Sequence, residues 1–258
     1  MPKIIAIANQ KGGVAKTTST FNLAYALVER GKRVLAIDAD PQASLTFLFG
    51  QDERELQLAE KTLYYSLVKD VPFSSIIIPG NPALVPSSII LAKVDRELMS
   101  MMRYTATLIR EKLQGIDGEY DFVLIDCPPT LTILTSNALT AADMVLIPAK
   151  TDLLSIIGVP LLLDEIEEIR SRHNNALKVW GVLPTLYNAS YNQDKEALAG
   201  LQEILEMKRI PLFDPIPRST AYDRSSAEGK PTLVLSPQTR GVDNFYKLAD
   251  QIINHHGE

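Results

Sequence analysis

The chain has 258 residues and a mass of 28.5 kDa, with 46% hydrophobic, 22% charged and 7% aromatic residues. This composition is typical of a globular protein with a sizeable core, and it excludes the disordered, collagen-like and coiled-coil classes. The single cysteine, Cys127, excludes a disulfide framework and a four-thiolate metal site within one chain. A net charge of -5 is not typical of a nucleic-acid-binding protein, whose overall electrostatic field is usually positive. It does not exclude a local basic patch.

The first residues, MPKIIAIANQ, lack the basic and apolar pattern of a secretory leader. No apolar run approaches the roughly 20 residues that a membrane span needs. Together with the lone cysteine, these features predict a cytoplasmic protein.

Short apolar runs alternate with helical patterns along the chain. Near-continuous aliphatic runs are typical of strands that are buried on both faces of a parallel sheet. Apolar residues at i, i+3 and i+4 spacing predict helices at Thr17–Glu29 and Leu161–Arg172. The pattern predicts an α/β fold, a doubly wound and mostly parallel sheet with helices on both faces. The five predicted strands are Lys3–Ala8, Arg33–Ile37, Phe122–Ile125, Met144–Ile147 and Val179–Leu183.

The chain is predicted to form a single domain over residues 1–258, because it holds no internal repeat and no linker that would join two domains. Gly31 stands where a helix C-cap is expected. Residues 51–94 are the least regular and predict a surface insertion or an edge element. Residues 211–237, rich in Pro, Ser and Arg, predict long loops, and Val242–His256 predicts a final helix.

The segment GGVAKTT, residues 12–18, follows the first strand and opens a helix, which is where a phosphate-binding loop must lie. Small residues let backbone N–H groups surround phosphate oxygens, a lysine reaches the β- and γ-phosphates, and a threonine hydroxyl binds Mg²⁺. Lys16 and Thr17 meet the last two needs, whereas Ala15 stands where the general pattern has glycine. The predicted loop residues are Gly12, Gly13, Val14, Ala15, Lys16, Thr17 and Thr18.

Two further strands end in acidic motifs. The second strand runs into Asp38-Ala39-Asp40-Pro41-Gln42, and a later one into Asp126-Cys127-Pro128-Pro129. Open α/β sheets bind ligands at the carboxyl ends of their strands, and an apolar strand that ends in Asp is a usual second holder of Mg²⁺. Three such motifs in order predict a nucleotide site.

These motifs resemble those of the ParA/MinD family of deviant Walker A ATPases. KGGVAKTT, with Lys11 before the glycines, resembles the family's first box, and IDADPQAS and VLIDCPP resemble the other two. PIPRSTAYDRSSAEGKP, followed by PQTRG, resembles the late segment of the ParA/Soj branch. The resemblance is therefore to partition or cargo-positioning ATPases, McdA-like ones included. The chain starts at the ATPase core, so the resemblance implies no N-terminal DNA-binding extension.

The resemblance implies an ATP- and Mg²⁺-dependent ATPase with slow intrinsic turnover, which dimerises around ATP. Lys11 would cross a nucleotide-sandwich dimer to the phosphates of the partner, and Lys16 would hold the β- and γ-phosphates. The Mg²⁺ residues would be Thr17, Asp40 and Asp126. Asp40 would also position or activate the attacking water; Asp38 is the alternative for that role, or it supports the loop by hydrogen bonds.

The chain departs from the family pattern in the phosphate loop and after a strand. Ala15 replaces a glycine, which costs about 1 kcal/mol if that position needs a positive φ and little if it does not. Lys150 stands where Soj-like chains more often carry an uncharged polar residue. It is either an added cation near phosphate or DNA, or a solvated loop lysine.

The resemblance also places the purine near Asn188, Pro217 and Arg218. It implies non-specific binding of the ATP dimer to double-stranded DNA through basic residues late in the chain, although Ala221 replaces an arginine of the Soj-like pattern. Each of these residues is otherwise a solvated or ion-paired side chain. The candidates for DNA binding are Arg218, Arg224, Lys230 and Arg240.

The partners implied are a second copy of the chain, nucleoid DNA and a ParB-like or McdB-like adaptor that stimulates hydrolysis. The cargo is a plasmid, a chromosome, a carboxysome or a chemosensory cluster, and the motifs do not distinguish these. A MinD-like membrane role is the alternative, but the end LADQIINHHGE lacks the basic residues of an amphipathic membrane helix, and no stable membrane association is expected. His255 and His256 in that segment are expected to be solvent-exposed.

Two other enzyme classes have a similar fold, but neither fits this sequence well. An iron-protein reductase needs two cluster cysteines in each subunit, and this chain has one cysteine. An amide ligase like dethiobiotin synthetase would keep the phosphate loop but gives no reason for Lys11 and the DPQ motif.

Overall fold

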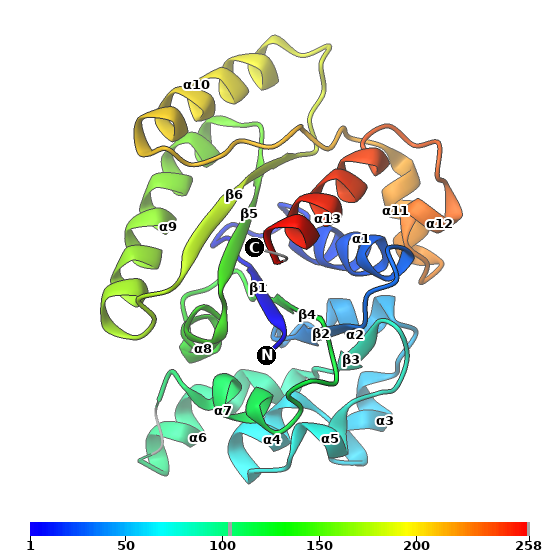
Figure 1. Ribbon diagram of the computed structural model, residues 1–258, viewed down its shortest axis with the longest axis vertical. Helices are drawn as coiled ribbons and strands as arrows, with labels where there is room; N and C mark the ends of the chain where they lie inside the picture. Colours follow the sequence, from blue (N-terminus) through cyan, green and yellow to red (C-terminus); the bar gives the residue numbers. More distant parts are fainter. Residues whose placement is uncertain (103–104, 257–258) are drawn as a thin grey trace.

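The computed structural model describes residues 1–102 and 105–256, without the side chains of His255 and His256, so the expectation for these two histidines lies outside the described part. Its centre is a six-stranded sheet in the order β3-β2-β4-β1-β5-β6 (Figure 1). Every neighbouring pair is parallel. The strands are β1 (Lys3–Ile7), β2 (Val34–Asp38), β3 (Ala83–Val85), β4 (Phe122–Asp126), β5 (Met144–Lys150) and β6 (Lys178–Thr185).

Side chains of each central strand alternate between two hydrophobic clusters, one on each face of the sheet. In β1, Ile4 and Ala6 lie in one cluster, and Ile5 and Ile7 lie in the other. This alternation follows from the two-residue repeat of a strand, and both faces are apolar because helices cover both. The predicted doubly wound α/β sheet is therefore confirmed.

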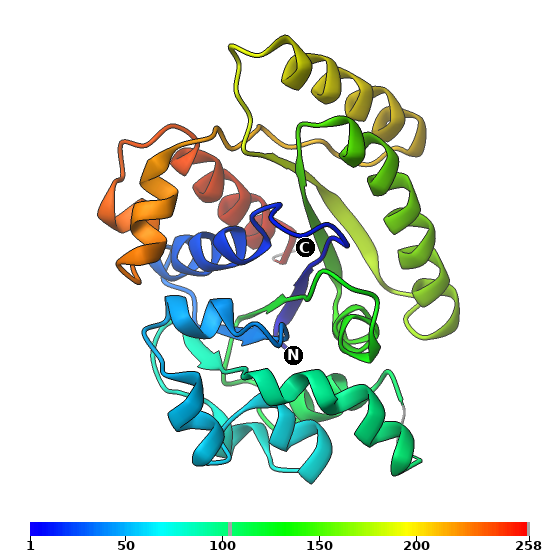
Figure 2. The same cartoon turned by 180° about the vertical axis from the view of Figure 1, so that it is seen from behind.

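Helices flank the sheet on both sides, as Figures 1 and 2 show. Helices α1 and α13 cover one face, while α4, α7, α8 and α9 supply buried residues to the other. The described helices are α1 (Lys16–Glu29), α2 (Ser44–Leu48), α3 (Glu53–Leu58), α4 (Leu63–Lys69), α5 (Phe73–Ile76), η1 (Ile89–Lys93), α6 (Val94–Ser100), α7 (Leu108–Gln114), α8 (Ile133–Ala141), α9 (Leu153–Arg172), α10 (Asn192–Lys208), α11 (Thr220–Ala227), α12 (Thr232–Leu235) and α13 (Val242–His256).

Several element predictions are confirmed. The five predicted strands are present with ends shifted by a few residues, and α13 has the predicted bounds. Gly31 has a φ of 74°, and its N–H donates to the Val28 carbonyl after α1, as a helix C-cap requires. The edge element expected within residues 51–94 is strand β3, which pairs only with β2 among the described strands.

Two element predictions are wrong. Helix α9 begins at Leu153 rather than Leu161 and continues through Pro160, because tertiary packing of Val159 and Leu162 outweighs the break that a proline predicts. The segment 211–237 is not only loop, since it holds α11 and α12. These helices have eight and four residues, too few for an apolar period to stand out, and α11 is capped locally by the Ser219 hydroxyl.

The glycine of β6 has a packing reason. A Cβ on Gly181 would stand 2.5 Å from the Phe213 ring and 2.8 Å from the Pro211 carbonyl oxygen. We expect Gly181→Ala to lower the free energy of unfolding by about 1–3 kcal/mol. The reason is that the added Cβ would clash with Phe213 and with the Pro211 backbone, and β6 cannot shift away from them. In α9, Gly158 has open space around it, so Gly158→Ala should stabilise by about 0.5–1 kcal/mol. Urea titrations compare the two, and equal effects would contradict this packing account.

Candidate functional site

The loop between β1 and α1 is held in a tight curve by contacts on both sides. The Asn9 side chain accepts a hydrogen bond from the Lys11 N–H at 2.9 Å. The Thr185 hydroxyl, at the end of β6, donates to the Val14 carbonyl at 3.1 Å. The Lys16 ammonium donates to the Lys11 carbonyl at 3.2 Å, across the curve. The loop therefore keeps its shape through its own chain and the neighbouring sheet.

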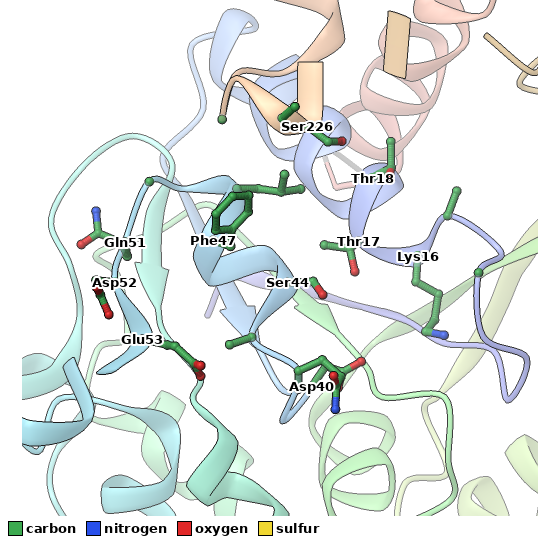
Figure 3. A pocket seen from close by; sticks show the side chains of 18 of the residues that line it. Lys16, Thr17, Thr18, Asp40, Ser44, Phe47, Gln51, Asp52, Glu53 and Ser226 are labelled. Atoms are coloured by element: carbon green, nitrogen blue, oxygen red, sulfur yellow. Dashed lines mark hydrogen bonds between the residues drawn. The ribbon is translucent and has the colours of Figure 1, made fainter. Parts of the chain in front are cut away.

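The first turn of α1 leaves its backbone donors open. It has no side-chain cap and no acidic residue. A helix N-terminus in this state carries free N–H groups and a partial positive charge, which suit an anion. The turn opens into a cavity of about 1230 Å³, lined by Gly12, Gly13, Ala15, Lys16, Thr17, Thr18 and Asp40 among others (Figure 3). The predicted loop residues other than buried Val14 therefore face one space with Asp40.

The conformation of Ala15 answers the question that the sequence left open. Its φ is 60° and its ψ is 32°, which is the left-handed region. A residue with a Cβ pays roughly 1–2 kcal/mol there, so the alanine at this position is strained. The strain lies at the point where the phosphate loop turns into α1.

Two carboxylates lie side by side beneath the loop. Asp38 and Asp126 end strands β2 and β4, and they are direct partners in the strand register. Both are fully buried. Asp38 accepts hydrogen bonds from the Thr46 N–H at 2.8 Å, the Thr46 hydroxyl at 2.7 Å and the Asp40 N–H at 3.2 Å. These bonds favour the supporting role for Asp38 rather than a role at the reacting atoms.

The carboxylate of Asp126 is only half satisfied. Its Oδ1 accepts a long bond from the Thr20 hydroxyl at 3.3 Å, and its Oδ2 has no hydrogen-bond partner among the described residues. Burial, and then the charge of Asp38, raise the pKa of Asp126 to about 8, against the opposing influence of the Thr17 side chain and the charge of Lys16. Burial also lowers the pKa of Lys16, against the pull of Asp126. A buried oxygen without a donor is costly, and a hydrated cation would satisfy it.

Asp40 faces the large cavity from a loop that is held from behind. Its Oδ1 accepts from the Gln42 N–H at 2.9 Å. The Ser87 hydroxyl donates to the Asp40 carbonyl at 2.7 Å, and the Ser87 N–H donates to the Thr46 hydroxyl at 2.9 Å. Asp38, Thr46 and Ser87 thus form a buried chain of hydrogen bonds that sets the position of Asp40. The sequence analysis missed Thr46 and Ser87, because nothing in their local pattern marks them.

Lys11 is paired within its own chain. Its Nζ lies 2.5 Å from the Asp152 Oδ2, and Asp152 also caps α9 by accepting from the Ser155 N–H at 2.9 Å. Hydrogen bonds from Lys11 and Ser155 lower the pKa of Asp152, although partial burial is the largest influence and opposes them. No local pattern marks Asp152, which lies 141 residues from Lys11 along the chain.

A second cavity of about 420 Å³ opens on the other side of the loop. It brings together Asn188, Pro217 and Arg218, the three residues expected near a purine, with Ala15 and Thr18. Asp194 shapes this side, since its carboxylate accepts from the Asn188 N–H at 2.8 Å and the Thr151 hydroxyl at 2.9 Å. The two cavities share the start of α1, so an elongated ligand can extend across both.

The four basic residues that were predicted to bind DNA lie in the segment that holds α11, α12 and the loops beside them. All four side chains are exposed. Arg224 pairs with Glu228 at 2.9 Å, one turn along α11. The other three form no ion pair with a described residue. They are Arg218, Lys230 and Arg240.

Comparisons with known proteins show which family the chain belongs to. A family model described as an AAA domain matches residues 2–179. Sporulation initiation inhibitor protein Soj of Bacillus subtilis is 36% identical over 259 residues, 98% of each chain. Chromosome partitioning protein ParA of Caulobacter vibrioides is 34% identical over 258 residues, 98% of this chain and 94% of the other.

Solved structures show the same fold. Cobyrinic acid a,c-diamide synthase from Mycobacterium smegmatis, with a bound ATP analogue and magnesium, has a TM-score of 0.82 and 33% identity, covering 99% of this chain and 96% of the other. Apo McdA of Cyanothece has a TM-score of 0.86 and 25% identity, covering 98% and 100%. The fold and loop define a P-loop nucleotide-binding protein. The chain belongs to the ParA/MinD family of deviant Walker A ATPases.

Relief of the Ala15 strain is measurable. We expect Ala15→Gly to raise the free energy of unfolding by up to about 1 kcal/mol, because glycine adopts a positive φ without a Cβ clash but gains entropy in the unfolded chain. The control is Ala199→Gly on the exposed face of α10, which should destabilise by about 0.5–1 kcal/mol. Denaturant titration distinguishes them, and destabilisation by both changes would refute the strain.

The buried carboxylates give a pH dependence. Burial raises the pKa of Asp38 to about 7 and that of Asp126 to about 8, above the usual value of 3.8. Their favourable contribution to folding is complete below about pH 4 and is lost as the pH rises through 7 to 8. In EDTA without nucleotide, the free energy of unfolding should therefore fall by up to about 4 kcal/mol between pH 6 and 8.5, which is measured as a fall in the melting temperature.

The variant Asp38→Asn tests the origin of this pH dependence. It removes one of the two adjacent charges and keeps an oxygen acceptor for Thr46, so the fall above pH 6 should become smaller. A fall of undiminished size in Asp38→Asn would show that other groups cause it.

Proposed function

We propose that this chain is an ATP-dependent, dimerising ParA-type ATPase that binds non-specific DNA and positions or segregates a cargo, with hydrolysis stimulated by an adaptor protein. The observation that carries the proposal is the open phosphate loop beside the orphaned buried carboxylate of Asp126. Membership of the ParA/MinD family supports it.

The residues fit ATP and Mg²⁺. The described residues hold no group of three or more His, Cys, Asp or Glu side chains that could bind a metal alone. Mg²⁺ instead binds commonly through one or two protein oxygens, waters and nucleotide phosphates. Thr17 would be the protein ligand, with Asp126 holding the metal's water shell through its unpartnered Oδ2. Bound there, the metal would neutralise developing phosphate charge.

The phosphate loop and Lys16 would hold the β- and γ-phosphates, since free N–H groups and an ammonium meet at the same cavity. Asn188, Pro217 and Arg218 would contact the base in the second cavity. Asp40 faces the large cavity close to Lys16 and Thr17, so it would orient the attacking water and also contact the metal's shell. Its backbone is fixed through Ser87, which suits such a positioning role.

The pairing of Lys11 with Asp152 gives dimerisation a cost. To reach the phosphates of a partner, Lys11 must leave a carboxylate 2.5 Å away. The loss of this ion pair is offset only if Lys11 meets another group of high negative charge. ATP offers more negative charge than ADP, because it carries the γ-phosphate. Dimerisation would therefore depend on ATP, and hydrolysis would release the dimer.

The exposed arginines and lysine near α11 would bind DNA phosphates once two copies bring them together. A protein with a net charge of -5 can bind DNA through such a local surface, weakly and with a strong salt dependence. The name of one relative, chromosome partitioning protein ParA, supports a role in segregating a cargo. We place the protein in the cytoplasm at the nucleoid, as one ATPase domain, with a ParB-like or McdB-like adaptor and a plasmid, chromosome or carboxysome as cargo.

The MinD-like membrane alternative has less support. Helix α13 buries its apolar residues Phe245, Leu248 and Ile252 in the cluster that it shares with α1, so this face is not free to enter a bilayer. Among the described residues, no helix is both long and apolar enough to span a membrane.

Binding to non-specific duplex DNA tests the proposal. The wild type and Asp40→Ala, which should keep the ATP state, are measured with ATP, ADP and no nucleotide over a salt series. We expect binding only with ATP, falling steeply with salt, and its loss in Lys11→Ala because the dimer cannot form.

The surface is tested with the double variant Lys230→Ala/Arg240→Ala, which should weaken DNA binding at least tenfold while the ATP dimer persists. The matched control is Arg170→Ala on α9, away from α11, which should change binding little. An ATP dimer that does not bind DNA at low salt would contradict the proposed binding to nucleoid DNA. Binding of that dimer to liposomes would then favour the membrane alternative.

A further inference from the structure

The carboxylate of Asp194 joins two segments of the chain beyond the point where their strands pair. Among the described residues, the pairing of β5 with β6 ends at Lys150 and Thr185. Past that pair, Oδ2 of Asp194 accepts a hydrogen bond from the Thr151 hydroxyl at 2.9 Å and one from the Asn188 N–H at 2.8 Å. One oxygen in the first turn of α10 therefore bridges the residue after β5 and the loop after β6.

The loop after β6 is bonded in turn to the segment that carries Arg218. The Tyr187 N–H donates to the Ile216 carbonyl at 3.2 Å, and the Tyr187 carbonyl accepts from the Arg218 N–H at 2.9 Å. Tyr187 and Pro217 thus form a short parallel bridge. Both segments supply residues to the second cavity. They form one continuous wall, and Asp194 ties this wall to the end of β5.

The tie is anchored in the interior. Thr151 has an exposed fraction of only 5%, and Asp194 is half-buried. Hydrogen bonds to a carboxylate that is partly shielded from water are stronger than bonds between neutral groups. Because both bonds end on a single oxygen, they hold the Thr151 hydroxyl close to the Asn188 N–H. Asp194 therefore fixes the position of the Asn188 loop relative to the sheet.

The Asn188 side chain would contact the base in the proposed function, and its own amide is already oriented. Its Oδ1 accepts from the Ser190 N–H at 3.0 Å. A ligand binds more tightly to a loop that is fixed beforehand, because ordering a loop on binding costs free energy. The phosphate loop is held separately, through Asn9 and Thr185, so the tie at Asp194 acts on the nucleoside side of the site.

We infer that Asp194 is a positioning residue for the nucleotide, whose carboxylate fixes the wall that carries Asn188 to the end of β5 and thereby strengthens the binding of ATP and ADP. This role rests on the nucleotide site proposed above, and it is exerted through Asn188 rather than on the ligand. ATP and ADP share the nucleoside, so both affinities depend on the tie. The tie needs an acceptor oxygen at this position, and it does not need a charge.

The test compares two variants that remove the same charge. Asp194→Asn keeps an oxygen that can accept both bonds, whereas Asp194→Ala keeps none. In calorimetric titrations of the purified full chain with ADP and a non-hydrolysable ATP analogue, Asp194→Ala should bind both about three- to tenfold more weakly than Asp194→Asn. The matched control is Glu196→Ala, at an exposed acidic residue two positions along α10, which should change neither affinity.

A double-mutant cycle separates positioning from direct contact with the ligand. In the Asn188→Ala background, the difference between Asp194→Ala and Asp194→Asn should shrink to less than about twofold, because the side chain that Asp194 positions is gone. A difference of the same size in both backgrounds would overturn the inference, since Asp194 would then act on the ligand directly or on the fold as a whole.

Equal affinities of Asp194→Ala and Asp194→Asn, or an equal loss in Glu196→Ala, would also overturn the inference. Melting temperatures without nucleotide show which variants are folded. If Asp194→Ala is not, Thr151→Val decides the matter, because it removes one of the two donors and keeps the shape of the side chain. Nucleotide affinities as high as those of the wild type in Thr151→Val would then contradict the role of the tie. Failure of the wild type to bind either nucleotide would instead refute the proposed function.

Discussion

The site depends on one constraint, the tight curve of the chain between β1 and α1. This curve turns the N–H groups of α1 toward open space and leaves them without a cap. It needs a positive φ at Gly13 and at Ala15, and it is held by a local hydrogen bond between Asn9 and Lys11 and by a tertiary one from Thr185. The strain at Ala15 persists because the sheet and helix on either side fix the chain more strongly than one Cβ contact opposes it.

Burial of charge is the second organising feature. Parallel strands bring Asp38 and Asp126 to the same edge of the sheet, where neither meets water. Asp38 is compensated by Thr46, whereas one oxygen of Asp126 has no hydrogen-bond partner in the part of the chain that the structure describes. The same low dielectric that raises the pKa of Asp126 would make a bound cation there strongly favourable. The fold thus accepts a local cost that a ligand would remove.

Three lysines surround the loop, and each is held differently. Lys16 lies within the curve and donates to a loop carbonyl, Lys11 is turned away to Asp152, and Lys150 approaches from β5 without a partner among the described residues. In the proposed function, such an arrangement would separate binding of a nucleotide from the response to its terminal phosphate. Lys16 already lies at the loop, while Lys11 would first have to exchange one anion for another.

The sequence by itself determined the order of strands and helices, the loop and the acidic strand ends, because these depend on local patterns of apolar, glycine and acidic residues. The tertiary structure alone decided the rest. Strand β3 and helices α11 and α12 are too short for a period, and the partners of Lys11 and Asp38 come from distant residues or from positions without a motif. The φ of Ala15 and the direction of Lys150 depend on how β5 and β6 pack beside the loop, which no local pattern encodes.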